Sequence, residues 1–214
     1  MDEFLNQIRN DHHNFDKGKL SNPLGYDPFT LFEKWYKEAF ESTEKEPNAM
    51  VLSTVDLDLN PSSRILYLKE LSSDGFVFFT NYKSRKGQDL DQNKRASLLF
   101  FWPTLERQLR IEGLIEKSSE QISDEYFASR PRNSQLGAWA SSQSEILNER
   151  EELDNRLIEL EKRFPNEVPR PPHWGGYILR ANYFEFWKGR PSRLHDRIVF
   201  EQKENKWDLF RLNP

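Results

Sequence analysis

Three short apolar segments joined by tight turns constrain the fold of this chain most. Residues 49–55, 63–71 and 76–81 are rich in β-branched, aromatic and aliphatic side chains, which is typical of strands. The link at 56–61 is rich in Asp and Asn, and residues 72–75 read Ser-Ser-Asp-Gly, a turn sequence. Neither link is long enough for a helix that crosses over a sheet. The segments therefore predict antiparallel hairpins.

The remaining periodic segments predict more strands and a few helices. Helices are expected from Asp27 and Pro28, an N-cap followed by proline at the first helical position, and over residues 118–128. A capping box at residues 142–145 predicts a third long helix, with an apolar stripe that packs on the core. Residues 132–135 are interpreted as a polar loop. Further strands are predicted over residues 96–101, 107–115, 176–181, 183–187, 193–201 and 206–211.

These elements predict a mainly β (α+β) fold with seven or eight antiparallel strands and three or four peripheral helices. Chains of this kind usually close their sheet edges into a barrel. The simplest division is a single domain over residues 1–214. Residues 1–26 have weak periodicity and mixed charge, and we expect them to form an N-terminal arm that packs late or becomes ordered with ligand.

Composition excludes several classes of function. The net charge of −4 argues against general affinity for nucleic acids or membrane surfaces. Aromatic residues make up 14% of the chain and supply the area for a core, although hydrophobic content is only 36%. The absence of Cys excludes disulfides and thiol chemistry. No secretion signal and no apolar run of roughly 20 residues is seen, so we expect a cytoplasmic protein.

A basic pair lies where a short helix is predicted after the third strand. Ser84 is the expected N-cap, and Arg85 and Lys86 occupy the first turn. Cations there oppose the helix dipole, but free backbone N–H groups and two cations together bind a phosphate well. Ordinary surface charge fits the same pattern. Tyr126 and Arg130 share a helix face and, with Ser134, form a weaker candidate for a second phosphate site.

Residues 184–197 predict a strand, a turn and a second strand with several charged side chains. Alternation along the second strand would place Arg193, His195 and Arg197 on one face. Two guanidiniums beside an imidazole are costly to bury without an anionic partner. The pattern indicates either a solvated edge strand or a pocket wall for an anionic or electron-rich ligand, with His195 placed to handle a proton. The adjacent His12 and His13 lack further ligands at a matching spacing, so no metal site is predicted.

Two long motifs resemble a known family. Glu-Phe-Trp-Lys-Gly at 185–189 and Arg-Leu-His-Asp-Arg at 193–197 are similar to the C-terminal signature of the pyridoxamine 5'-phosphate oxidases. Residues 64–69 resemble the family's R-I-x-x-L-K strand, and the resemblance extends from Asp27 onward. It implies a split β-barrel that binds flavin mononucleotide (FMN) and a homodimer whose sites are built from both subunits. The implied reaction oxidises pyridoxine or pyridoxamine 5'-phosphate to pyridoxal 5'-phosphate, with oxygen reduced to hydrogen peroxide.

The resemblance also implies the residues of the site. Arg193 and His195 would be catalytic: Arg193 favours negative charge on the pyridine ring, and His195 orients the substrate or accepts its proton. The implied substrate contacts are Lys69, Tyr126, Arg130, Ser134, Arg193, Leu194 and His195. The implied FMN contacts are Arg64, Ile65, Leu66, Tyr67, Leu68, Lys69, Phe79, Thr80, Arg85, Lys86, Gln108, Gln143, Ser144, Trp187 and Arg197.

Some positions depart from simple expectation. A regular strand would place Arg64 and Lys69 on opposite faces, so a bulge or two separate sites is required. The family's arm often carries R-x-x-Y, which closes over the substrate, whereas His12 and Phe15 stand here. Phe15 cannot donate a hydrogen bond. Glu46 replaces an Asp near the first strand. These departures concern the lid and substrate affinity, and they leave the implied flavin residues unchanged.

Two alternative functions fit the same sequence, because one fold serves many chemistries. The first is a split-barrel flavin reductase or oxidase that acts on another planar substrate. The second is a non-enzymatic protein that binds flavin or pyridoxal phosphate.

Overall fold

The computed structural model describes residues 6–7, 9–10, 14–23, 25–72, 75–204 and 206–214 of the 214-residue chain. The chain divides into two compact units. Unit 1 comprises Met1–Pro47, Leu99–Ile111 and Tyr183–Pro214, and unit 2 comprises Asn48–Leu98 and Glu112–Asn182. The predicted single domain over 1–214 stays a prediction.

Within the described residues, nine strands form one hydrogen-bonded sheet. The order along the main path is β2-β1-β5-β6-β7-β4-β3, and β8 pairs with both β7 and β9. The registers of β1–β2, β3–β4, β4–β7, β7–β8 and β8–β9 are all antiparallel. This sheet confirms the predicted mainly antiparallel fold class, with more strands than the seven or eight expected. The strands are β1 (Ala49–Val55), β2 (Pro61–Tyr67), β3 (Glu70–Ser72), β4 (Gly75–Asn81), β5 (Arg95–Trp102), β6 (Arg107–Lys117), β7 (Trp174–Lys188), β8 (Asp196–Lys203) and β9 (Lys206–Leu212).

In unit 1, helix α2 (Pro28–Phe40) packs on the sheet through aromatic side chains. It begins as predicted: the Asp27 carboxylate accepts hydrogen bonds from two backbone N–H groups of the first turn, and Pro28 occupies the first helical position. The buried Trp35 ring meets the Phe186 ring edge-on, with centroids 5.1 Å apart. Because Phe186 lies on β7, this contact anchors the strand that leads into the β7–β8 connection.

In unit 2, helix α3 (Arg85–Gln92) starts directly against the end of β4. Ser84 is its N-cap, as predicted, and the Ser84 hydroxyl accepts a hydrogen bond from the Gly87 backbone N–H. A Cβ atom at position 87 would collide with the carbonyl oxygen of Tyr82. Glycine therefore lets the helix turn pack closely on the preceding chain.

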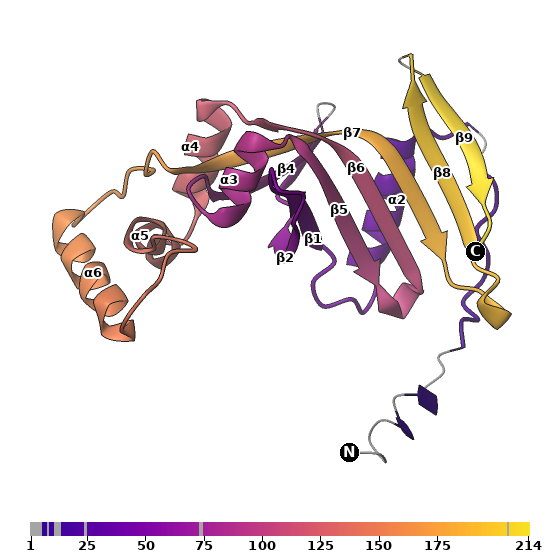
Figure 1. Cartoon of the computed structure of the whole chain (residues 1–214), viewed down its shortest axis with the longest axis horizontal. Helices are drawn as coiled ribbons and strands as arrows, with labels where there is room; N and C mark the ends of the chain where they lie inside the picture. Colours follow the sequence, from indigo (N-terminus) through magenta and orange to yellow (C-terminus); the bar gives the residue numbers. More distant parts are fainter. Residues whose placement is uncertain (1–5, 8, 11–13, 24, 73–74, 205) are drawn as a thin grey trace. The chain divides into compact units, whose positions relative to one another are not determined.

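Three further helices complete unit 2. Helix α4 (Glu120–Ser129) follows β6, and α5 (Arg132–Ala140) and α6 (Arg150–Arg163) lie side by side (Figure 1). A buried cluster of Phe127, Leu136, Val168 and Trp174 joins α4 and α5 to the start of β7. Among the described residues, no helix is both long and apolar enough to cross a membrane.

Two sequence predictions in this region are wrong. Residues 132–135 form the first turn of α5 and not a loop, because Leu136 is buried in the cluster. The predicted capping box at 142–145 does not open a helix. Ser144 has a left-handed φ of 76°, and α6 begins only after Glu149. The apolar stripe predicted for this helix comprised Ile146, Leu153, Leu157, Leu160 and Phe164. Ile146 is 94% exposed, whereas Leu157, Leu160 and Phe164 pack on the cluster.

Candidate active site

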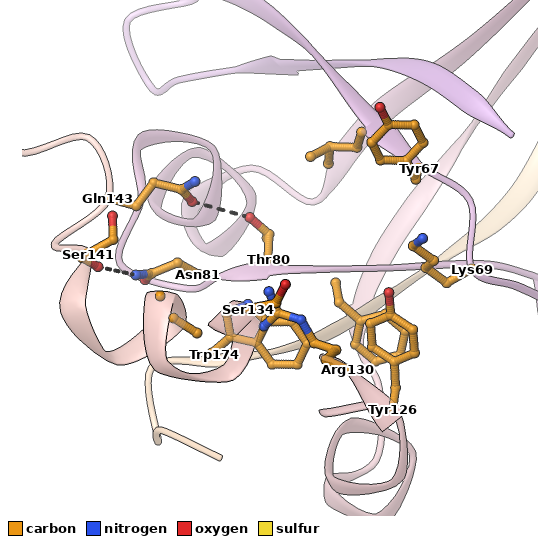
Figure 2. Close-up of a pocket in the computed structure, with 14 residues that line it drawn as sticks. Tyr67, Lys69, Thr80, Asn81, Tyr126, Arg130, Ser134, Ser141, Gln143 and Trp174 are labelled. Atoms are coloured by element: carbon orange, nitrogen blue, oxygen red, sulfur yellow. Dashed lines mark hydrogen bonds between the residues drawn. The ribbon is translucent and has the colours of Figure 1, made fainter. Parts of the chain in front are cut away.

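A cavity of about 390 Å³ in unit 2 brings together the predicted phosphate-binding residues of the substrate site. Lys69 comes from the β2–β3 connection, Tyr126 from α4, Arg130 from the end of α4, and Ser134 from α5. Figure 2 shows these side chains lining the cavity from separate elements. A Lys, an Arg and two hydroxyl groups around one space form a donor set suited to an oxyanion.

Arg130 is the most constrained cation of this first cavity. Its guanidinium carbon lies 4.6 Å from the centroid of the Trp174 ring, and burial lowers the Arg130 pKa. The buried Nη1 atom has no hydrogen-bond partner among the described residues. A buried donor without a partner costs about 1–3 kcal/mol. An anionic ligand group in the cavity would supply the missing acceptor.

Stacked aromatic rings hold one wall of the first cavity rigid. The Phe79 ring stacks on Tyr126 with centroids 4.0 Å apart and on Trp174 with centroids 5.6 Å apart. Phe79 lies opposite Gly176 in the β4–β7 register, where a side chain would press on the Phe79 ring. The Lys69 ammonium lies 5.9 Å from the Tyr126 centroid. This stack therefore fixes the position of Tyr126 next to both cations.

The strand that carries Arg64 ends before it reaches Lys69. Strand β2 stops at Tyr67, and the Lys69 backbone N–H donates to the Val77 carbonyl as the chain enters β3. Arg64 lines a second cavity, whereas Lys69 lines the first. The sequence predicted that Arg64 and Lys69 lie on opposite faces of a regular strand. The structure accommodates this spacing because each residue lines a different cavity.

The second cavity, of about 430 Å³, is strongly cationic. It also lies in unit 2, and Arg64, Arg85 and Lys86 all line it, as do Gln143 and Ser144. The Arg64 guanidinium is held from behind: Nη1 donates to the Leu52 carbonyl oxygen at 3.2 Å. Three cations beside one another favour a ligand with negative charge.

Lys86 is almost fully buried at this wall. Its ammonium donates to the Ser84 hydroxyl and to the Gln143 Oε1 atom, each at 3.1 Å. Burial, followed by the charge of Arg64, lowers the Lys86 pKa to about 8. A bound anion would act in the opposite direction and favour the charged lysine. The lysine is therefore arranged to gain from an anionic ligand.

The two cavities adjoin within unit 2. Leu66 and Gln143 line both of them. The Thr80 hydroxyl donates to Gln143 Oε1 at 3.5 Å, a contact visible in Figure 2. Unit 2 therefore holds two neighbouring spaces, each lined by cations and each suited to one anionic group.

In unit 1, the β7–β8 connection carries Arg193, Leu194 and His195. The short helix η2 (Pro191–Arg193) fills the turn, and Ser192 and Arg193 have left-handed φ angles of 57° and 60°. Strand β8 begins only at Asp196. The prediction that Arg193, His195 and Arg197 alternate along one strand face is therefore wrong, because Arg193 belongs to the turn.

His195 is held in a defined orientation. Its Nδ1 atom accepts a hydrogen bond from the Arg190 backbone N–H at 3.1 Å, and its ring lies 4.6 Å from the Trp187 ring. Burial and the nearby Arg193 charge lower the His195 pKa. With Nδ1 as the acceptor, a neutral His195 carries its proton on Nε2. Nε2 is then a hydrogen-bond donor.

The N-terminal segment touches this histidine. The Phe15 ring meets the His195 ring edge-on at 5.2 Å and fills the space that a side chain at Gly189 would need. The next two backbone N–H groups, of Asp16 and Lys17, donate to the buried Glu106 carboxylate. Phe15, which departs from the family pattern, thus contacts a predicted catalytic residue within unit 1.

Arg197 is paired with a buried carboxylate. Its Nε atom donates to Glu185 at 2.7 Å, which raises the Arg197 pKa, and its Nη1 atom donates to the Asn213 carbonyl. Glu185 also accepts a hydrogen bond from Arg110 at 2.7 Å. Arg197 lies opposite Trp187 in the β7–β8 register. Trp187 and Arg197, both predicted to contact flavin, are therefore neighbours.

Comparison with known proteins gives the family. The family described as pyridoxamine 5'-phosphate oxidase matches residues 36–162, and the pyridoxine 5'-phosphate oxidase C-terminal dimerisation region matches residues 174–214. A Bordetella pertussis relative named pyridoxine/pyridoxamine 5'-phosphate oxidase is 54% identical, over 94% of this chain and 96% of the relative. One of the same name from Actinobacillus pleuropneumoniae serotype 3 is 52% identical, over 98% of this chain and 99% of the relative. The chain belongs to the pyridoxamine 5'-phosphate oxidase family.

Solved structures agree with this family assignment. PhzG from Burkholderia lata 383, crystallised with tetrahydrophenazine-1-carboxylic acid, superposes with a TM-score of 0.87 at 30% identity, over 93% of this chain and all of that one. A Nostoc punctiforme protein described as pyridoxamine 5'-phosphate oxidase-related and FMN binding has a TM-score of 0.70 at 15% identity, over 89% of this chain and 99% of that one, which shows the fold alone. The predicted family, split-barrel fold class and oxidoreductase class are confirmed.

The residues carried over from the family fall into three groups. Unit 1 holds the β7–β8 group of Trp187, Arg193, Leu194, His195 and Arg197. Leu68 and Gln108 line neither cavity: Leu68 is a buried residue after β2, and Gln108 lies on β6. His12 lies outside the described residues, and Glu46 is exposed ahead of β1. The others line the cavities of unit 2, namely Arg64, Ile65, Leu66, Tyr67, Lys69, Phe79, Thr80, Arg85, Lys86, Tyr126, Arg130, Ser134, Gln143 and Ser144.

Several lining residues of the first cavity were not predicted from the sequence. Gly137, Ala138 and Ser141 lie on α5 or just after it, and that helix was not predicted. Asn81 donates to the Ser141 carbonyl at 3.5 Å (Figure 2). Its place at the end of the strand before the predicted phosphate helix was the signal that could have identified it.

Proposed function

We propose that this chain oxidises pyridoxamine 5'-phosphate or pyridoxine 5'-phosphate to pyridoxal 5'-phosphate, with FMN as its cofactor. The observation that carries the proposal is the buried, unpartnered Nη1 of Arg130 in a cavity that also presents Lys69, Tyr126 and Ser134. This donor set fits the phosphate of the substrate. The relatives that are more than 50% identical bear names for this activity.

The donor chemistry of the second cavity fits the phosphate of FMN. Arg64, Arg85 and Lys86 supply three cationic groups, and burial leaves Lys86 with a lowered pKa that an anion would raise. Gln143 and Ser144 supply further polar contacts. By family resemblance, the remaining flavin contacts are Ile65, Leu66, Tyr67, Leu68, Lys69, Phe79, Thr80, Gln108, Trp187 and Arg197.

Bound FMN would supply the redox chemistry, taking hydride from substrate C4' at flavin N5 and reducing oxygen to hydrogen peroxide. The protein's part is to bind, orient and bias charge. Lys69, Tyr126, Arg130 and Ser134 hold the substrate phosphate. Arg193 stabilises negative charge on the pyridine ring.

His195 has a narrower role than the sequence alone allowed. Because its Nδ1 atom accepts the Arg190 N–H, its Nε2–H is the group free to face a ligand. We therefore assign His195 as a hydrogen-bond donor that orients the substrate. Proton acceptance at Nε2 would require the other tautomer, which would lose the hydrogen bond from Arg190.

The protein is further proposed to act as a cytoplasmic homodimer. The match of residues 174–214 to the family's dimerisation region supports the homodimer. By resemblance, FMN lies at the subunit interface and each site uses both subunits.

The test is an anaerobic titration of the FMN-loaded protein with pyridoxine 5'-phosphate and, separately, pyridoxamine 5'-phosphate. We expect the flavin absorption band to bleach and to return on admission of air, with release of hydrogen peroxide and pyridoxal 5'-phosphate. A band that stays oxidised with both substrates, while FMN remains bound, would refute the proposed activity.

Oxidation of another planar substrate is the second candidate. The similarity to PhzG, whose crystal contains a tetrahydrophenazine carboxylic acid, favours it. A substrate of that class carries a carboxylate and no phosphate. Bleaching of the flavin band by such a compound, but not by pyridoxine 5'-phosphate or pyridoxamine 5'-phosphate, would favour this candidate. The cations that line the first cavity favour the two phosphorylated substrates.

A further inference from the structure

Asp89 contacts two residues that line the second cavity, Ser62 and Arg64. It is a buried residue of α3, and its Oδ2 atom accepts hydrogen bonds from the Thr54 hydroxyl at 2.6 Å and the Ser62 hydroxyl at 3.2 Å. Ser62 and Arg64 line the cavity, whereas Asp89 does not. Neither the sequence motifs nor the family resemblance assigns it a role. A buried carboxylate at this place requires a reason, because an uncompensated charge is costly to bury.

The same two hydroxyls connect Asp89 to Arg64. Arg64 donates from Nη1 to the Thr54 hydroxyl oxygen at 2.8 Å and from Nη2 to the Ser62 hydroxyl oxygen at 2.6 Å. A hydroxyl that gives its proton to a carboxylate turns its lone pairs toward another donor. The Asp89 carboxylate, 3.8 Å from Nη2, therefore fixes both acceptors of the guanidinium as well as balancing its charge.

Asp89 also acts on Lys86. The charged groups that act on Lys86 are Arg64 on β2 and Asp89 on α3, and its polar contacts are Ser84 and Gln143. Arg85, the other cation of the second cavity, acts on Arg64. Burial and Arg64 favour the neutral lysine, and Asp89 opposes them. Asp89 is the charge in this environment that raises the Lys86 pKa and so favours the ammonium form.

We propose that Asp89 is a positioning residue of the flavin phosphate site, which fixes Arg64 through Thr54 and Ser62 and maintains the charge of Lys86. The inference rests on the proposed function, in which this cavity takes the FMN phosphate. It makes affinity for that phosphate depend on pH through Lys86, with Asp89 setting the pH at which affinity falls.

The test compares FMN with riboflavin, which lacks only the phosphate. Dissociation constants of both flavins for the full chain, measured by flavin fluorescence from about pH 6.5 to about pH 9.5, give a ratio that isolates the phosphate contribution. In the wild type, the preference for FMN should fall as the pH rises through the Lys86 pKa. In Asp89→Asn the fall should begin about one pH unit lower. At about pH 8.5, FMN should bind about tenfold more weakly than to the wild type. Riboflavin affinity should stay within about twofold, because it makes no phosphate contact.

Two further variants separate positioning from general stability. Asp91→Asn removes an exposed carboxylate of the same helix, paired with Lys94, and should leave the pH dependence unchanged. Adding Lys86→Arg to Asp89→Asn should abolish the fall, because arginine stays charged over this range. A folded Asp89→Asn variant with the wild-type midpoint would overturn the inference. A wild type that binds FMN and riboflavin equally at every pH would refute the flavin phosphate assignment itself, and the inference with it.

Discussion

At the scale of single residues, Arg130 gives the sharpest prediction for the substrate site. Arg130→Ala should raise KM for pyridoxine 5'-phosphate by roughly 10- to 100-fold, because hydrogen bonds to charged groups contribute about 1.5–3 kcal/mol. FMN content per protomer should not change, because Arg130 does not line the second cavity, which is proposed to bind the FMN phosphate. Steady-state kinetics and the flavin absorbance of the purified protein provide the two measurements.

Arg132→Ala is the matched control for Arg130→Ala. Arg132 is an exposed arginine two residues further on, outside both cavity linings, and it binds the Phe164 and Asn166 carbonyls. Its removal should leave KM within about twofold of the wild type, as for a surface substitution. Equal increases in KM for the two variants would contradict the assignment of Arg130.

The His195 assignment predicts a shift in a measurable pKa. Arg193 is one of the two causes that lower the His195 pKa, so Arg193→Gln should raise it. The acid limb of activity, where protonation of Nδ1 breaks the hydrogen bond from Arg190, should then move to higher pH. NMR titration of the histidine ring signals, assigned with His195→Asn, measures the shift. The His173 signal serves as the internal reference, and an unmoved His195 titration would contradict the assignment.

Residues whose environment is set locally were predictable, and those set by the tertiary fold were not. Ser84, Arg85 and Lys86 could be placed because helix capping depends on a few neighbouring residues. Arg193 was misplaced because Ser192 and Arg193 itself adopt left-handed conformations, which no alternation rule anticipates. Asp89 looks like any acidic residue on a short helix. Only the fold buries it against Thr54 on β1.

At the scale of elements, two glycines in helices predict opposite effects of the same substitution. Gly87→Ala should lower the free energy of unfolding by about 1–3 kcal/mol, because its Cβ would collide with the Tyr82 carbonyl at the start of α3. Gly137→Ala on α5 meets no atom within 4 Å and should raise stability by about 0.5–1 kcal/mol. Urea unfolding of both variants tests the pair, and destabilisation by Gly137→Ala would show that α5 is packed differently.

The elements that were predicted correctly are those with a strong local signal. The β1–β2 and β3–β4 hairpins have the predicted short polar turns, and Asp27-Pro28 marks the start of α2. The single strand predicted over residues 63–71 is wrong, because the chain leaves β2 after Tyr67 and starts β3 at Glu70. Helix α5 was missed because its sequence is polar at the start and its helical state depends on burying Leu136. The capping-box motif at residues 142–145 was outweighed by the left-handed Ser144. Both misses are tertiary effects, and they hid part of the first cavity wall.

At the scale of the whole molecule, the proposed site residues are distributed between the two units. The phosphate-binding donors belong to unit 2, and Arg193, His195 and Arg197 belong to unit 1. The matched dimerisation region contains the whole of the latter group. If each site draws on both subunits, as we propose, the homodimer would be required for activity and not only for stability.

Subunit mixing tests this requirement directly. Arg130→Ala and Arg193→Ala each impair a different group, so each variant alone should have low activity. If a site combines Arg130 of one subunit with Arg193 of the other, then in dimers formed by co-expressing equal amounts of the two variants, random pairing restores about a quarter of the sites to wild type. If one subunit supplies both residues, every site in the mixture carries a substitution and activity stays low. Activity per bound FMN, with the dimer mass measured by light scattering, distinguishes these outcomes. A monomeric protein with full activity would contradict the shared site altogether.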